Sequence, residues 1–156
     1  MSFLKKYKVD LIFVAITLLP AILSAFLSGN YDVYASLNKP PLSPPAFLFP
    51  IAWTILYTLM ALAAAEVYKS NDLEKGTALK LYFLQLFVNL VWPIIFFRFE
   101  APKFALFWLL LLIIIVIITY RSFKSISKKA GLLLIPYILW LLFAFYLNFG
   151  IIILNS

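Results

Sequence analysis

Long apolar runs separated by short polar segments make up most of the chain. A helix needs about 20 residues to cross a hydrocarbon core about 30 Å thick, and five runs are that long. Their centres are uncharged, and none alternates over about 10 residues as a membrane-barrel strand does. We therefore predict an all-α membrane protein, a bundle of five transmembrane helices in one domain over residues 1–156. The expected spans are residues 9–29, 46–68, 78–98, 102–122 and 131–154.

The connections between these runs are short, so consecutive helices should be antiparallel neighbours. The first run follows Lys5, Lys6 and Lys8, as the core of a signal peptide would. It is longer than such a core, and no small-x-small cleavage site follows it. We expect this segment to be retained as the first helix.

The amino-acid composition limits the chemistry that this chain can perform. Apolar and aromatic residues make up 65% of the chain, charged residues 12%, and the mean hydropathy is +1.05, which excludes a soluble domain. The chain has no His and no Cys, which excludes imidazole bases, thiol catalysis, disulfides and the usual metal and haem ligands. We expect no metal site and no resident cofactor. Function must rest on aromatic rings, amides, hydroxyls and backbone.

The net charge of +7 gives an orientation. If the N-terminus is cytoplasmic, ten of the 13 basic residues lie inside and only Lys39, Arg98 and Lys103 lie outside. The positive-inside rule explains this split without a nucleic-acid partner. We therefore expect a cytoplasmic N-terminus and, after five helices, a C-terminus outside. The inner basic residues are Lys5, Lys6, Lys8, Lys69, Lys75, Lys80, Arg121, Lys124, Lys128 and Lys129.

The first outer connection, residues 30–45, is rich in proline. Five of the nine prolines fall between Pro40 and Pro50. Proline fixes φ and removes a hydrogen-bond donor, so residues 31–45 should form neither helix nor regular sheet. We expect a stiff, polyproline-like strap. It is either a rigid linker between two helices or a lid over a cavity.

Three of the expected helices carry aromatic and amide side chains at helical spacing. One interpretation is interhelical hydrogen bonding or an interfacial aromatic belt. The other is a flat apolar cavity walled by indoles, with small residues such as Ser24 and Ala144 leaving room for a planar ligand. The three stripes are Phe49, Trp53 and Tyr57; Gln85, Asn89, Trp92 and Phe96; and Trp140, Ala144 and Asn148.

At these residues the sequence closely resembles the TspO/MBR family, which includes the tryptophan-rich sensory proteins and the translocator protein. Three blocks carry the resemblance, in the family's order and over most of the chain. They are Tyr34-Ala35-Ser36-Leu37-Asn38-Lys39-Pro40 with Pro44-Pro45, Trp53-Thr54 and Leu56-Tyr57; Gln85 to Asn89 with Trp92-Pro93 and Phe96-Phe97; and Pro136-Tyr137, Trp140, Phe143-Ala144 and Leu147-Asn148.

The resemblance implies a five-helix bundle, commonly a homodimer, with a cavity that opens toward the first loop. It implies hydrophobic planar ligands such as protoporphyrin IX, isoquinoline carboxamides and benzodiazepines, and porphyrin degradation in light and oxygen that depends on Trp53 and Trp140. The implied ligand-binding residues are Ser24, Tyr34, Phe49, Trp53, Asn89, Trp92, Trp140 and Ala144.

Some positions depart from the family pattern. Val33 replaces an aromatic residue, the paired glycines of the first helix are absent, and the end of the last helix lacks the proposed cholesterol motif. Sterol binding is therefore not expected. The Lys- and Ile-rich composition favours a bacterial plasma membrane over a mitochondrial outer membrane.

Three functions remain open from the sequence. The leading hypothesis is a porphyrin receptor or sensor with photo-oxidative activity. The alternative is a transporter of tetrapyrroles or lipid-like molecules, although the chain lacks the internal repeats and mid-span charges typical of coupled carriers. A third is a structural membrane protein whose stripes only pack.

Overall fold

The structure, a computed structural model, describes residues 2–29 and 31–156. Five of its helices are long and apolar enough to cross a membrane, and no strand occurs in this part of the chain, which confirms the predicted fold class. The spanning helices are α2 (Lys8–Ser28), α4 (Leu48–Lys69), α5 (Lys75–Pro93), extended by the π-helix η1 (Ile94–Arg98), α6 (Pro102–Ile126) and α7 (Lys128–Leu154). Two short helices, α1 (Phe3–Lys6) and α3 (Asp32–Ser36), lie outside the spans.

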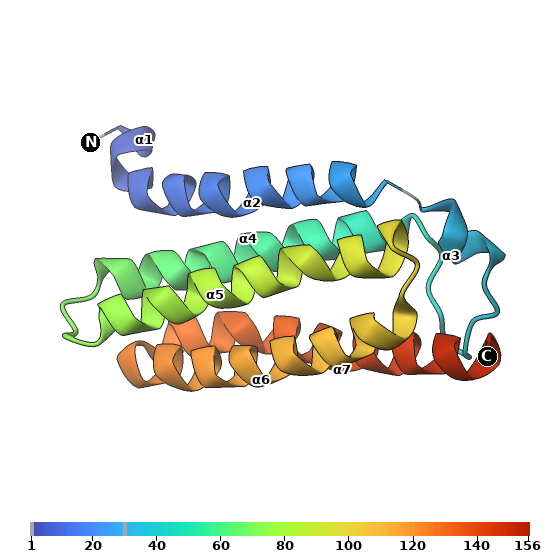
Figure 1. The fold of residues 1–156 in the computed structure, drawn as a ribbon. Coiled ribbons are helices and arrows are strands. Elements are labelled where there is room, and N and C mark those ends of the chain that lie inside the picture. The colour runs from blue at the N-terminus through green and yellow to red at the C-terminus, as the bar shows by residue number, and fades with distance from the viewer. Residues whose placement is uncertain (1, 30) are drawn as a thin grey trace.

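The five long helices run side by side (Figure 1), and their contacts close a ring. α4 packs against α2 and α7, α6 packs against α7 and α5, and α5 with η1 returns to α2. Ala61, Ala64 and Ala65 of α4 are completely buried, because small side chains let helices approach closely where lipid gives little hydrophobic drive. Tyr82 of α5 and Leu134 of α7 fill the same core.

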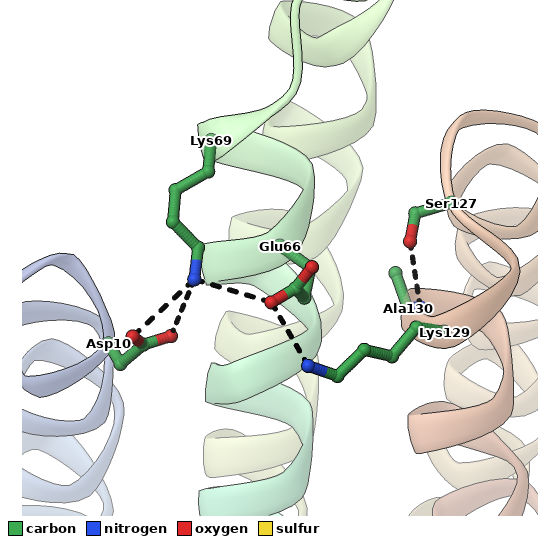
Figure 2. Close-up of polar contacts among 6 residues, drawn as sticks. All are labelled: Asp10, Glu66, Lys69, Ser127, Lys129 and Ala130. Carbon is green, nitrogen blue, oxygen red and sulfur yellow. Dashed lines mark hydrogen bonds and ion pairs between the residues drawn. The ribbon is translucent and has the colours of Figure 1, made fainter. Parts of the chain in front are cut away.

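The lysine-rich end of the bundle is tied by ion pairs (Figure 2). Lys69 of α4 contacts Asp10 of α2 at 3.1 Å and Glu66 at 3.3 Å, and Lys129 of α7 contacts the same Glu66 at 3.3 Å. The side chains are partly exposed, so each pair contributes at most about 1 kcal/mol. Together they join three helices at one end.

The prediction that residues 31–45 form no helix is wrong for α3, residues Asp32–Ser36. The first proline of the strap is Pro40, so nothing blocks a helical turn before it. The backbone becomes extended at Leu37, and Leu42 takes a φ of 70° in the turn that follows Pro41. The first residue of the expected loop, Asn30, lies outside the described residues.

The third expected span, residues 78–98, combines α5 with η1. The amide of Phe99 donates to the carbonyl of Ile94 at 3.1 Å, one residue further back than in an α-helix. This widened turn follows Pro93 and rotates the side chains after it relative to α5.

Candidate functional site

A cavity of about 460 Å³ lies in the strap half of the bundle. Its size falls within the range of small-molecule sites, about 300–1,000 Å³. The residues that line it include no Asp, Glu, Lys or Arg among those the structure describes. They are Ala21, Ser24, Ala25, Tyr31, Tyr34, Ala46, Phe47, Phe49, Pro50, Trp53, Tyr57, Asn89, Trp92, Pro93, Phe96, Phe97, Leu109, Leu112, Leu141, Ala144, Leu147, Asn148 and Ile151.

The structure gathers most of the candidate site residues at this cavity. The ones that line it are Ser24, Tyr34, Phe49, Trp53, Asn89, Trp92 and Ala144. Trp140 lies behind the lining: its ring meets Phe49 edge-on at 6.0 Å and Trp53 edge-on at 6.3 Å between centroids. The roles of these residues in binding and catalysis stay predictions.

The π-helix builds one aromatic wall. Trp92 and Phe96 stack with centroids 5.1 Å apart, and Phe97 meets them edge-on at 6.2 and 4.9 Å. The ring of Tyr31 packs on Phe97 at 5.1 Å. In a regular α-helix Phe97, five residues after Trp92, would point about 140° away from it. The i→i+5 turn of a π-helix brings residues five apart closer to one face, and Trp92, Phe96 and Phe97 all line the cavity.

A chain of buried hydrogen bonds lies at the deep end of the cavity. Tyr57 donates to Asn89 Oδ1 at 2.7 Å, and Asn89 Nδ2 donates to the hydroxyl of Tyr137 at 2.7 Å. Tyr137 in turn donates to Gln85 Oε1 at 2.8 Å. These bonds join α4, α5 and α7, so the amides of α5 help to hold the helices together.

The other polar groups of the cavity also have protein partners. Trp92 Nε1 donates to Asn148 Oδ1 at 3.3 Å, and Ser24 donates to the carbonyl of Leu90 at 2.6 Å. Among the described residues, no buried side-chain nitrogen or oxygen lacks a partner. A ligand would therefore be held mainly by apolar and aromatic contact.

Several lining residues were not among the candidates. Tyr57, Phe96 and Asn148 belonged to the predicted stripes, so their four-residue spacing was the signal that could have placed them there. No pattern in the sequence marked Leu109 and Leu112 of α6 as lining residues, because the leucines of a uniformly apolar helix cannot be told apart by spacing or composition.

The strap covers one end of the cavity. Tyr34 is 8% exposed, donates to the carbonyl of Pro44 at 2.8 Å and packs edge-on against Phe49 at 5.2 Å. Lys39 Nζ donates to the carbonyls of Tyr34 at 2.9 Å and Leu37 at 3.1 Å. Burial raises the pKa of the Tyr34 phenol above its usual value, so the hydroxyl keeps its proton and remains a donor.

Contacts with the end of α7 fasten the strap. The side-chain amide of Asn155 accepts from the amide of Asn38 at 3.0 Å and donates to its carbonyl at 2.8 Å. Tyr146 donates to the carbonyl of Pro41 at 2.7 Å. At Gly150, a Cβ would lie 2.6 Å from the ring of Pro40, so glycine allows the strap to dock. Figure 1 shows the strap and the C-terminus at the same end of the bundle.

A five-helix integral membrane protein with an aromatic, uncharged cavity under a proline-rich strap is the class that fold and site define. Residues 12–154 match the model of the TspO/MBR family, and the chain belongs to that family.

Its curated relatives come from bacteria, archaea and eukaryotes. The chain is 42% identical over 126 residues to the tryptophan-rich protein TspO of Chlorobaculum tepidum, covering 78% of both chains. It is 37% identical over 136 residues to the tryptophan-rich sensory protein of Cereibacter sphaeroides, covering 87% of this chain and 84% of the relative. It is 36% identical over 145 residues to the translocator protein of Bos taurus, covering 87% and 85%. The family resemblance predicted from the sequence is confirmed.

Proposed function

We propose that the chain is a membrane receptor or sensor that binds porphyrins, such as protoporphyrin IX, and similarly flat drug-like ligands in the cavity. The observation that carries this proposal is the lining itself: indole, phenol and phenyl rings surround about 460 Å³ of space without one charged side chain among the described residues. Such a site suits a large planar apolar molecule better than a sugar, an ion or a peptide.

The ligand would be held by its faces and edges. No His or Cys is present to ligate a metal at its centre. Trp53 and Tyr57 present adjacent rings 5.3 Å apart, and Trp92 and Phe96 offer a second stacked pair at 5.1 Å. Aromatic pairs of this kind add about 0.5–1.5 kcal/mol each beyond area burial.

Porphyrin degradation in light is part of the proposal. The excited porphyrin and dioxygen would supply the oxidising equivalents, and the protein would supply position rather than acid–base catalysis. Of the two tryptophans proposed for this reaction, Trp53 lines the cavity, while Trp140 does not line it and meets Trp53 edge-on with ring centroids 6.3 Å apart. Trp53 should therefore matter more than Trp140.

The packing of the lysine-rich half favours binding over transport. Met60 and Ala61 of α4, Tyr82 of α5 and Leu134 of α7 are at most 1% exposed. A solute crossing the bundle would have to displace this core. Within residues 2–29 and 31–156, no matching pair of broken helices suggests alternating access. The proposed location is a bacterial plasma membrane, and the proposed assembly is a homodimer.

The test is a titration of the purified full chain with protoporphyrin IX. Trp53 and Trp92 line the cavity, so binding should quench tryptophan fluorescence stoichiometrically and raise thermal stability. Illumination in air should then bleach the bound porphyrin, more slowly in Trp53→Phe than in Trp140→Phe. If the porphyrin neither quenches nor stabilises the protein, the binding proposal is wrong. If both single variants bleach at the wild-type rate, the tryptophan mechanism is wrong.

A further inference from the structure

The cavity is closed by packed side chains on most sides and exposed on one. Lining residues of α5, η1, α6 and α7 are buried or half-buried, as Asn89 and Phe96 are. The exposed lining residues among those described come from the end of α2, from the start of the strap, and from the start of α4 with the residues before it. They are Ala25, Tyr31, Ala46, Phe47 and Pro50.

The two helices beside this opening are joined at the lysine-rich end. Asp10 of α2 pairs with Lys69 of α4 at 3.1 Å, as Figure 2 shows, and Phe13 packs on Tyr68 with centroids 5.6 Å apart. These contacts fix the distance between α2 and α4 there.

At the strap end, α2 and α4 contact different helices. α2 is held to α5 and η1, because Ser24 donates to the carbonyl of Leu90 and Arg98 donates to the carbonyl of Leu27 at 3.1 Å. α4 instead packs on α7, where Trp53 and Phe49 meet Trp140. At this end each helix is therefore held to a different neighbour, and α2 presents only the small side chains of Ala21, Ser24 and Ala25 to the cavity.

Residues 34–41 of the strap close a different side. Asn38 and Pro41 are hydrogen-bonded to the end of α7, and Pro40 rests on Gly150. Tyr34 reaches from this segment over the cavity and is buried. The strap side is thus fastened shut, while the exposed side is lined by apolar side chains such as Phe47, which is 69% exposed.

From these contacts we infer that ligands enter and leave the cavity sideways from the bilayer, between the strap-side ends of α2 and α4, with the ion-paired lysine-rich end holding the two helices together. The inference rests on the proposed function, since it concerns the route to the same cavity. It fits the ligand class: a flat apolar molecule partitions into the membrane, and the rim it meets is apolar and uncharged. The strap then separates the cavity from water, and ligands do not enter through it.

Variants at the rim test the route. Ala25→Trp should narrow the opening and slow both association and dissociation of protoporphyrin IX several-fold in proteoliposomes, whereas Phe47→Ala should widen it and speed both. Leu23→Trp is the matched control, because Leu23 lies on α2, is 59% exposed and does not line the cavity. Asn155→Ala loosens the strap and should leave both rates at wild-type values. The inference is overturned if Asn155→Ala speeds exchange while both rim variants exchange like wild type.

A tethered ligand separates this inference from the proposed function. The probe is a porphyrin attached to the end of a phospholipid acyl chain, which keeps it among the lipid tails. Lateral access predicts stoichiometric quenching of tryptophan by this probe in wild type and slower quenching in Ala25→Trp. If the free porphyrin binds but the tethered one does not, the route is wrong and the function stands. If neither binds, both proposals are wrong.

Discussion

Replacing Asn89 by Leu should expose how much the buried hydrogen-bond chain stabilises the bundle. Asn89 is 3% exposed, accepts from Tyr57 and donates to Tyr137, both at 2.7 Å. Leu is similar in size but removes both bonds. Tyr137 still donates to Gln85 at 2.8 Å, but the hydroxyl of Tyr57 loses the acceptor it uses in the structure.

The magnitude follows from these partners. An unsatisfied buried hydroxyl costs about 1–3 kcal/mol. The bond to Tyr137 is an interhelical bond within the membrane, and such bonds contribute about 0.6 kcal/mol on average and about 1.7 at most. We therefore expect Asn89→Leu to lower the free energy of unfolding by about 2–4 kcal/mol. Once Tyr57→Phe has removed the hydroxyl, the same change at Asn89 should cost only the second bond.

The assay is a double-mutant cycle on reversible unfolding of the full chain in bicelles. Asn89 and Tyr57 should couple by about 1–2 kcal/mol. Gly76→Ala provides the control partner, because it lies on the same helix about 20 Å from Asn89 at 1.5 Å per residue. Changes at Asn89 and Gly76 should add. Additivity between Asn89 and Tyr57, within about 0.3–0.5 kcal/mol, would refute the reasoning.

Two further predictions concern stability. Gly150→Ala should undock the strap, because its Cβ would lie 2.6 Å from Pro40, and should therefore make the strap more sensitive to protease. At Gly76 nothing lies within 4 Å of an added Cβ, so Gly76→Ala should instead stabilise the protein by about 0.5–1 kcal/mol. Equal sensitivity of the strap in both variants would contradict the docking. Glu66→Gln should remove the carboxylate that joins Lys69 to Lys129 and, because two ion pairs are lost, lower the free energy of unfolding in low salt by at most about 2 kcal/mol, with the difference from wild type shrinking as salt is added. A loss unaffected by salt would contradict a role through charge.

Hydropathy placed the five helices because crossing a bilayer requires about 20 apolar residues in a row, whatever the tertiary packing. The same reasoning could not find η1. Its widened turn shifts the register by one residue over Ile94–Arg98, and no change of composition marks that shift. The helical turn Asp32–Ser36 was missed because the strap was treated as one proline-rich unit, although its prolines begin at Pro40.

The stripes predicted which faces of α4, α5 and α7 would meet, because side chains four apart share a helix face. The stripes could not predict which of their side chains reach the cavity. Trp140 begins its stripe but does not line the cavity, and its ring packs edge-on against Trp53 of α4, which does. Gln85 begins another stripe, and its Oε1 accepts the hydrogen bond from Tyr137. Which member of a stripe reaches a cavity depends on the facing helix, and spacing along one chain does not contain that information.

Filling the cavity is the most direct test of its proposed role. Ala144 lines the cavity, and Leu142, close to it on α7, is 51% exposed and does not. Protoporphyrin IX should be titrated into wild type, Ala144→Phe and the control Leu142→Phe, with tryptophan quenching as the readout. The account predicts that Ala144→Phe weakens binding at least about tenfold, which is 1.4 kcal/mol, while Leu142→Phe binds like wild type. Equal affinity in all three proteins, each shown to be folded, would mean that the porphyrin binds elsewhere and would contradict the account.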